Sequence, residues 1–278
     1  MQIAFHKYHG AGNDFILVDN RSGSFTTGGS NQEALIARLC DRHTGIGADG
    51  LILVQHPTLP ASESAFRMLY FNADGLEGSL CGNGSRCAAA YAYAKGMTKG
   101  RQVVFEAVDG LHRAEILRDS KPAYVVRVSL RKCQAAEKLT NEQYYVDTGS
   151  PHLVWFTDKL DSLDVSTLGR KIRYDPKWGA RGVNVNFAEW AGDGSLRVRT
   201  YERGVEEETL SCGTGAAAVA LAGYLHQGGR PGHSTCTIHF RGGSLRLSFT
   251  PPDKAGGDFR DIWLEGPASM VFEGRLPV

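Results

Sequence analysis

The chain has 278 residues, with 31 Lys and Arg against 30 Asp and Glu, so its formal net charge is +1. No basic run or interleaved aromatic patch provides an electrostatic footprint for nucleic acid, and we expect no nucleic-acid partner. The first residues lack the pattern of a signal peptide, and no segment approaches about 18 uninterrupted apolar residues, so the sequence predicts a cytoplasmic protein with no membrane span. Its six cysteines would stay reduced in that compartment.

Strand-like segments rich in β-branched and aromatic residues recur along the whole chain and alternate with four helical patterns. Short glycine-containing links, such as Asp109-Gly110, tolerate the positive φ of tight hairpins, so we expect much of the sheet to be antiparallel. In chain order the sequence predicts strands at 2–8 and 14–19, a helix at 31–41, strands at 51–55 and 66–71, a helix at 83–95, strands at 102–108, 111–118, 123–131, 144–148 and 152–156, a helix at 163–172, strands at 183–190 and 195–202, a helix at 213–227, and strands at 234–241, 244–250 and 261–273. This mixture favours an α+β fold over a doubly wound α/β fold.

A repeated motif is the most informative feature of the sequence. Cys81-Gly-Asn-Gly-Ser-Arg-Cys, followed by alanines, returns 131 positions later as Cys212-Gly-Thr-Gly-Ala-Ala. Upstream, the segment 12–18 matches 149–154 in the same order and at nearly the same spacing. A period near half the chain is too long for a solenoid, whose repeats run to about 50 residues. The sequence therefore predicts two similar domains with a cleft between them.

The helices predicted after the two motifs consist of small or apolar residues nearly all the way round, which is typical of a helix surrounded by protein. We therefore expect each repeat to wrap its sheet around one such helix. This would place Cys81 and Cys212 at helix N-termini, where unpaired N–H groups and the helix dipole favour a thiolate and can hold a carboxylate. The motif glycines would let a ligand approach the backbone closely.

Two matched thiols indicate a reaction that needs a proton handler on each face of one carbon. Inverting a carbon that bears a hydrogen requires proton removal from one face and delivery to the other. A thiol suits both roles, because its ordinary pKa of about 8.5 leaves both forms accessible near neutrality. Helix N–H groups would stabilise the charge that develops beside a carboxylate. The scheme requires no electron-sink cofactor, and the sequence carries no motif for one.

Eight blocks carry a family resemblance: Gly10-Ala-Gly-Asn13-Asp-Phe, Arg42-His-Thr-Gly-Ile-Gly-Ala-Asp49-Gly50, Phe71-Asn72-Ala-Asp-Gly, Cys81-Gly-Asn-Gly-Ser-Arg-Cys, Gly149-Ser-Pro-His152, Gly182-Val-Asn184, Tyr201-Glu202-Arg203-Gly and Ser211-Cys212-Gly-Thr-Gly. In this order they resemble the diaminopimelate epimerase family. The resemblance implies interconversion of LL- and meso-2,6-diaminopimelate, in lysine and peptidoglycan biosynthesis, without pyridoxal phosphate or metal. It also implies a homodimer.

The same resemblance implies an α+β fold of two pseudo-symmetric domains, each a mostly antiparallel or mixed sheet curled around a central helix. We expect residues 1–121 together with 267–278 to form the N-terminal lobe that carries Cys81. Residues 122–266 would form the C-terminal lobe that carries Cys212. The active site would then lie in the cleft between the lobes.

Residue roles follow from the resemblance position by position. Cys81 and Cys212 match the acid/base pair, and the resemblance also gives His152 and Glu202 catalytic roles, tuning the thiols or orienting the substrate. Groups that would bind the carboxylate and amino ends of the substrate are Asn13, Asn72, Gly82, Asn83, Ser150, Asn184, Arg203, Gly213 and Thr214. Taken alone, His152 would more often be a structural histidine.

Two positions depart from the commonest family pattern. Gly50 stands where many members have glutamine, and Ser150 stands where many have asparagine. Ser150 still offers a hydroxyl for hydrogen bonding, whereas Gly50 offers no side chain, so a direct contact from that position would be lost. The departures affect the details of substrate contacts and leave the reaction type unchanged.

Alternatives remain open from the residues themselves. Either cysteine motif alone would also fit another two-thiol racemase, such as a proline or hydroxyproline racemase. A protein of another class would be a redox-switched binding protein, in which Cys81 and Cys212 form a regulatory disulfide. Metal binding is not expected, because no Cys-x-x-Cys pair or ligand-spaced partner is present. The other cysteines, Cys40, Cys87, Cys133 and Cys236, are expected to be core residues.

Overall fold

The computed structural model describes residues 2–25, 30–60, 63–78, 80–134, 136–229, 232–254 and 256–277. The chain divides into two compact units, the first formed by Met1–Val128 with Gly266–Val278 and the second by Ser129–Glu265. The first unit extends to residue 128 rather than to the expected 121 because strand β7 (Ala123–Ser129) pairs antiparallel with β6 (Gly110–Ser120). The last strand, β16 (Arg260–Pro277), runs from the second unit back into the first.

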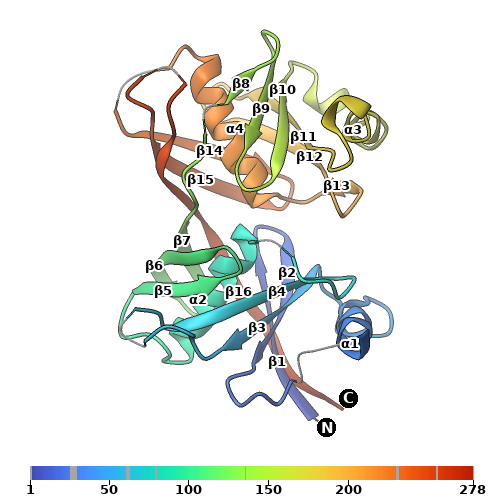
Figure 1. The fold of residues 1–278 in the computed structure, drawn as a ribbon, viewed down its shortest axis with the longest axis vertical. Helices are drawn as coiled ribbons and strands as arrows, with labels where there is room; N and C mark the ends of the chain where they lie inside the picture. Colours follow the sequence, from blue (N-terminus) through green and yellow to red (C-terminus); the bar gives the residue numbers. More distant parts are fainter. Residues whose placement is uncertain are drawn as a thin grey trace. The chain divides into compact units, whose positions relative to one another are not determined.

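The first unit is a sheet that closes on itself around one helix (Figure 1). Its strands follow the order β1-β2-β3-β4-β5-β6-β7-β16, and β16 also pairs with β1. Two neighbouring pairs, β2–β3 and β4–β5, are parallel and are joined through α1 and α2. The remaining elements are β1 (Gln2–Gly10), β2 (Asn13–Asp19), α1 (Ser30–Cys40), β3 (Gly50–Gln55), β4 (Phe66–Asn72), α2 (Gly82–Ala94) and β5 (Gln102–Ala107).

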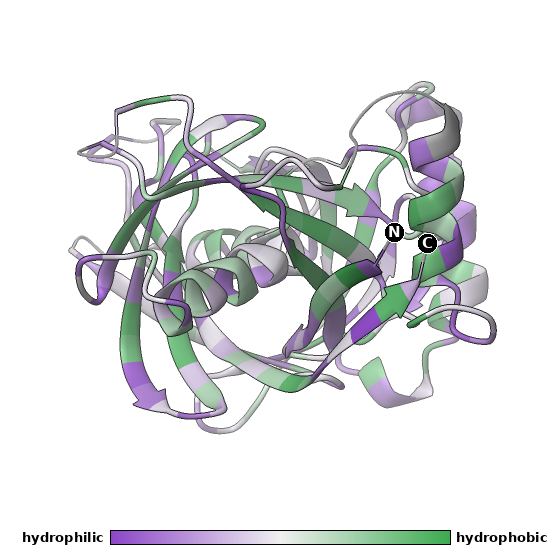
Figure 2. Ribbon diagram, turned by 90° about the horizontal axis from the view of Figure 1, so that it is seen from below, coloured by the Kyte–Doolittle hydropathy of each residue, from purple (hydrophilic) through white to green (hydrophobic). Residues whose placement is uncertain are grey.

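Helix α2 lies inside this sheet. It contacts every strand from β1 to β6, and its residues from Gly82 to Ala92 are buried. Figure 2 shows the helix of the first unit surrounded by strands. Small side chains explain the arrangement, because alanine and glycine let strands on several sides approach the helix axis closely.

The second unit repeats this plan. Its strand order is β16-β15-β14-β12-β11-β10-β9-β8, with β13 paired to β12. Again two pairs are parallel, β10–β11 and β12–β14, and α3 and α4 connect them. The elements are β8 (Glu137–Lys138), β9 (Gln143–Asp147), β10 (Pro151–Phe156), the 3₁₀ turns η1 (Leu160–Ser162) and η2 (Pro176–Trp178), α3 (Val165–Arg173), β11 (Asn184–Trp190), β12 (Leu196–Glu202), β13 (Glu207–Thr209), α4 (Gly213–His226), β14 (Ser234–Phe240) and β15 (Gly243–Thr250).

Helix α4 corresponds to α2. Residues Gly213 and Gly215 to Gly223 of α4 are buried, and the helix contacts β9, β10, β11, β14 and β15. The order β2-α1-β3-β4-α2-β5-β6 in the first unit matches β10-α3-β11-β12-α4-β14-β15 in the second. The predicted α+β fold, with a mixed sheet curled around a central helix in each half, is therefore confirmed.

Helix α3 packs against β12, at the end of which two predicted site residues lie. An added Cβ at Gly169 of α3 would lie 2.4 Å from the Cβ of Tyr201, so only glycine permits this approach of helix to strand. Glu202 and Arg203 follow Tyr201 directly. Within the part of the chain that the structure describes, no helix is long and apolar enough to cross a membrane.

Candidate active site

Cys81 is the N-cap of α2. Its backbone is extended (φ −101°, ψ 111°), and its Sγ accepts a hydrogen bond from the N–H of Gly84 at 3.4 Å. A Cβ at Gly84 would lie 3.1 Å from Cδ1 of Ile52 in β3, a tight contact that glycine avoids. The first turn of α2 therefore packs directly on the sheet, with the thiol at its N-terminus as predicted.

Cys212 holds the same position on α4. Its backbone is extended (φ −135°, ψ 115°), and its Sγ accepts from the N–H of Gly215 at 3.4 Å. A Cβ at Gly215 would come 2.5 Å from Oδ1 of Asn186, so glycine is required for the close approach of α4 to β11. Both thiols thus lie at the electropositive ends of buried helices.

A chain of hydrogen bonds connects Cys212 with β11. Nδ2 of Asn186 lies 3.1 Å from Nδ1 of His152, and Nε2 of His152 lies 3.0 Å from Oγ1 of Thr214. Thr214 Oγ1 in turn lies 3.5 Å from Sγ of Cys212. An amide nitrogen can only donate, so Nδ1 of His152 accepts and its Nε2 carries the proton. The hydroxyl of Thr214 can then donate to the sulfur.

His152 is a neutral member of this chain. The ring is fully buried, and burial, with a smaller contribution from Arg203, lowers its pKa to about 3. At neutral pH the imidazole therefore positions Thr214 and does not itself carry a charge. Asn186, which sequence reasoning missed, holds the ring through the bond to Nδ1 and also donates to the carbonyl oxygen of Leu153 at 3.1 Å. Its only signal in the sequence was a second asparagine two positions after Asn184 in a predicted strand.

In the first unit, two predicted binding residues face each other. Nδ2 of Asn83 donates to Oδ1 of Asn13, and Nδ2 of Asn13 donates to Oδ2 of Asp49 at 3.0 Å. Oδ1 of Asn83 accepts from Nη2 of Arg86 at 2.7 Å. Each asparagine amide is thus held in one orientation. Asp49 fixes the amide of Asn13, and Arg86 fixes that of Asn83.

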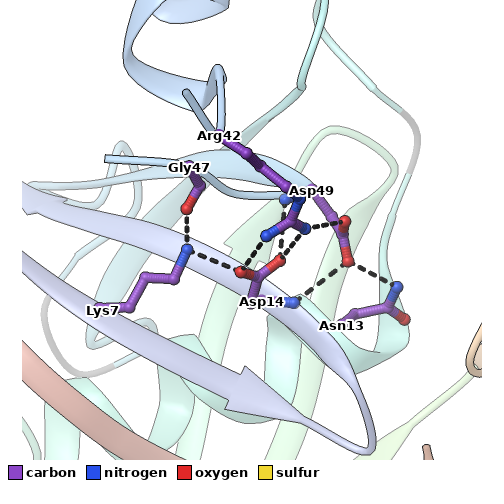
Figure 3. Close-up of polar contacts among 6 residues, drawn as sticks. All are labelled: Lys7, Asn13, Asp14, Arg42, Gly47 and Asp49. Carbon is purple, nitrogen blue, oxygen red and sulfur yellow. Dashed lines mark hydrogen bonds and ion pairs between the residues drawn. The ribbon is translucent and has the colours of Figure 1, made fainter. Parts of the chain in front are cut away.

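An ion cluster of Lys7, Asp14, Arg42 and Asp49 supports Asn13 (Figure 3). Arg42 donates to both oxygens of Asp14 at 2.7 and 3.0 Å and to Asp49 at 2.7 Å. Nζ of Lys7 lies 2.7 Å from Asp14 and also donates to the carbonyl oxygen of Gly47. Although burial alone would raise it, hydrogen bonds from Arg42 and Lys7 bring the pKa of Asp14 down to about 2.

The second unit brings together Ser150, Asn184 and Arg203. Nδ2 of Asn184 donates to Oγ of Ser150 at 2.9 Å and to the carbonyl oxygen of Pro151 at 3.0 Å. Oδ1 of Asn184 accepts from the backbone N–H of Arg203 at 2.8 Å, and the Arg203 guanidinium donates to Ser150 at 3.3 Å. Burial, together with Arg173 and Arg181, lowers the pKa of Arg203.

The remaining predicted residues lie at the ends of strands and helices. Asn72 is the exposed last residue of β4 and pairs with Gly50 of β3. Glu202 is the last residue of β12, and Gly82 and Gly213 are the buried first residues of α2 and α4. Each unit therefore carries one thiol with its own set of predicted binding groups.

The space beside Gly50 is already filled. A Cβ at Gly50 would lie 2.5 Å from the carbonyl oxygen of Phe71 and 2.6 Å from a ring carbon of Tyr70. The ring of Tyr70 also meets that of Phe15 edge-on, with the centroids 6.1 Å apart. The sequence indicates only a missing side chain at position 50, whereas the structure shows that an aromatic ring from β4 takes its place.

Comparison with known proteins gives the family that the sequence motifs resemble. The family model of diaminopimelate epimerase matches residues 5–131 and 144–271. The diaminopimelate epimerase of Flavobacterium psychrophilum is 42% identical over 275 residues, which cover 99% of this chain and 100% of that protein.

Among the described residues, no group of three or more His, Cys, Asp or Glu side chains could hold a metal ion.

Solved structures with similar folds come from proteins of lower sequence identity. A phenazine biosynthesis protein of the PhzF family from Bacillus anthracis has a TM-score of 0.77 at 14% identity, with all of both chains covered. A probable proline racemase from Agrobacterium radiobacter has a TM-score of 0.70 at 16% identity, covering 99% of this chain and 92% of its own. At such identities the likeness establishes the fold alone.

The ion cluster gives a prediction for stability at acid pH. Asp14→Asn should lower the free energy of unfolding by about 2 kcal/mol at neutral pH, because Lys7, whose side chain is 8% exposed, loses its ion pair. The folded-state pKa of Asp14, about 2, lies below the ordinary value of about 3.9, so this stabilisation is complete above about pH 4 and is lost as the pH falls to about 2. Urea unfolding measured along this pH range tests both statements.

A matched control is Asp19→Asn. Asp19 lies on the same strand and pairs with Arg21, but both side chains are more than a third exposed, at 36% and 38%. Its removal should cost at most about 0.5 kcal/mol. Equal losses for the two variants would contradict the special role of the cluster around Asp14.

Proposed function

This chain belongs to the diaminopimelate epimerase family, and we propose that it inverts the α-carbon of its substrate with the thiols of Cys81 and Cys212. The enzyme is an isomerase that converts LL-2,6-diaminopimelate to the meso form. The observation that carries the two-thiol proposal is the equivalence of Cys81 and Cys212, each the N-cap of a buried helix in one of two units of the same topology.

In the proposed reaction one cysteine is a thiolate and the other a thiol. The thiolate takes the α-proton from one face of the carbon, the C–H bond breaks, and its electron pair remains on a carbanion conjugated with the carboxylate. The second thiol then gives its proton to the opposite face and becomes the thiolate. No electron enters or leaves, and the reverse reaction exchanges the two roles.

The carboxylate next to the reacting carbon would be held by the helix N-termini. The N–H groups of Gly82 and Asn83 in α2, and of Gly213 and Thr214 in α4, belong to first turns whose donors lack helical partners. Such donors stabilise negative charge as it grows on the carboxylate oxygens. This accounts for a reaction that requires neither pyridoxal phosphate nor a metal ion.

The distal end of the substrate would be recognised by groups of both units. Asn13 and Asn72 from the first unit and Ser150, Asn184 and Arg203 from the second would hold its charged amino and carboxylate groups. The lowered pKa of Arg203, caused by burial and by the neighbouring Arg173 and Arg181, indicates a concentration of positive charge suited to a carboxylate. Glu202, on β12, would orient the substrate ammonium group.

The two alternative functions have weaker support. A proline or hydroxyproline racemase is favoured only by structural likeness at low identity, as with the probable racemase at 16%, whereas the family match extends over nearly the whole chain. A redox-switched binding protein would have no need of the side chains to which we assign substrate binding in each unit.

We further propose that the two units face each other across one cleft, and that the enzyme acts in the cytoplasm as a homodimer. The first statement is supported by the presence of one thiol and several of the proposed binding groups in each unit. Light scattering during size-exclusion chromatography should give twice the mass of one chain, and a monomer mass would refute the dimer.

Substitution of either thiol tests the mechanism. Cys81→Ala and Cys212→Ala should each reduce epimerisation by at least about 100-fold, since each removes one of the two proton-transfer groups. In deuterated water the wild-type enzyme should place deuterium on the inverted carbon. Circular dichroism of the variants serves as the control for folding, and full turnover by either one would exclude the two-thiol scheme.

The hydrogen-bond chain to Cys212 gives a separate prediction. Thr214→Val removes the hydroxyl between His152 and the thiol and should lower kcat by about 10-fold, the equivalent of one lost hydrogen bond of about 1.4 kcal/mol. Thr214→Ser keeps the hydroxyl and should restore most of the activity. Thr148→Val is the matched control, because the Thr148 hydroxyl donates to the backbone oxygen of Thr214, at 3.1 Å, and not to its hydroxyl. Equal losses of kcat for Thr214→Val and Thr148→Val would contradict a role for the hydrogen-bond chain from His152 to Cys212.

A further inference from the structure

Arg86 is a fully buried cation whose hydrogen-bond acceptors, among the residues that the structure describes, are neutral. Its relative exposure is 0%. Its Nη1 and Nε donate to the carbonyl oxygens of Gly82 and Pro267 at 3.4 and 3.3 Å, and its Nη2 donates to Asn83. Among the described residues, neither its hydrogen-bond acceptors nor its electrostatic partners include a carboxylate. A buried charge without a counter-charge is strongly unfavourable.

The titratable groups around α2 supply no such counter-charge. Burial raises the pKa of Cys87 and of Tyr91 on α2 to about 12, and it also raises the pKa of Tyr8 on β1 and of Tyr124 on β7. All four are neutral at physiological pH.

Charged groups farther along the neighbouring strands are already engaged or exposed. Glu273 on β16 has a side chain that is 63% exposed and faces His6. In the ion cluster on β1, β2 and the segment before β3, Lys7 and Arg42 balance Asp14 and Asp49. Neither set leaves a negative charge for Arg86.

Cys81 is the remaining candidate. It precedes Arg86 by five positions, and Nη1 of Arg86 contacts the carbonyl oxygen of Gly82, the residue that directly follows Cys81. Burial lowers the pKa of Arg86 to about 10, and its electrostatic interactions with Cys87 and Cys81 oppose this. Since Cys87 stays protonated, a thiolate at Cys81 is the anion that would balance the guanidinium.

The second unit lacks this feature. Five positions after Cys212 the sequence has Ala217, which is buried. The ring that reaches Cys212 through Thr214 is the neutral His152. The two thiols, equivalent in backbone position, therefore differ in the charge built beside them.

We propose that Arg86 is the counter-ion of Cys81 and makes it the thiol that is ionised before substrate binds, while its bond to Asn83 fixes the first turn of α2. The catalytic significance rests on the proposed two-thiol function. The charge pairing itself does not, because it can be measured on the thiol without turnover.

The test is the pH dependence of Cys81 alkylation by iodoacetamide, read by mass spectrometry of the Cys81 peptide. It is carried out in the Cys212→Ala background, so that only one of the paired thiols titrates. Arg86→Met should move the midpoint of this profile upward by about one pH unit or more, as expected for loss of a neighbouring opposite charge. An unchanged midpoint in a folded variant would overturn the proposal.

Two comparisons separate charge from structure. Arg86→Lys cannot reproduce the three guanidinium contacts but keeps the positive charge. The midpoint of Cys81 alkylation in this variant should therefore stay near that of the protein with arginine at position 86. If the lysine variant shifted as far as Arg86→Met, the role of charge would be refuted. In the Cys81→Ala background, Arg86→Met should leave the Cys212 midpoint unchanged, and an equal shift there would show a general disturbance and contradict the pairing.

The pH dependence of stability tests the proposal even if Arg86→Met does not fold. A thiol that is more acidic in the folded than in the unfolded state stabilises the protein above its unfolded pKa of about 8.5, and this stabilisation is lost as the pH falls through its folded value. The difference in free energy of unfolding between wild type and Cys81→Ala should therefore widen as the pH rises to about 8.5. A difference that is constant with pH would refute the pairing.

Discussion

The hydrogen bond from a first-turn N–H to a cysteine sulfur is the constraint that sets the position of both thiols. An N-cap is usually a Ser, Thr, Asp or Asn, whose oxygen binds the helix strongly. Here sulfur accepts at 3.4 Å in both helices, which is a longer and weaker contact. A residue that caps weakly can serve as a reagent, provided that packing rather than the cap holds the helix. That packing comes from burial of the alanine-rich helices. Gly84 and Gly215 allow the first turn of each helix to approach its sheet closely.

The two units share a backbone but not an electrostatic environment. In the first, a balanced ion cluster and two asparagines lead to Arg86, a buried cation. In the second, an asparagine, a neutral histidine and a threonine hydroxyl lead to Cys212. A reaction that begins with one thiolate and one thiol needs matched positions and unmatched charges. In the mechanism that we propose, duplication of the fold would provide the first condition, and divergence of the side chains near the two helix N-termini would provide the second.

Local patterns made the helices and their N-terminal cysteines predictable. Helices predicted at 83–95 and 213–227 form at Gly82–Ala94 and Gly213–His226, because small residues between glycines mark their extent. Contacts between distant segments could not be read in this way. The partner of Arg86 at Pro267 lies 181 positions away, and the ring of Tyr70 fills the space beside Gly50. The parallel strand pairs were equally hidden, since the pairing of strands joined through a helix leaves no short-range signature.

Asn184 illustrates how the structure changes the interpretation of a matched residue. The family resemblance suggests a direct substrate contact, yet its amide already donates to Ser150 and Pro151 and accepts from the backbone of Arg203. We infer that it acts first as a brace, holding the Arg203 backbone while the serine hydroxyl receives the guanidinium at 3.3 Å. Serine at position 150 suits this geometry, because its hydroxyl accepts from both Asn184 and Arg203. The longer side chain of an asparagine at this position would need more room. In the proposed function, recognition of the distal carboxylate would then fall chiefly on Arg203, whose backbone N–H is bound by Asn184.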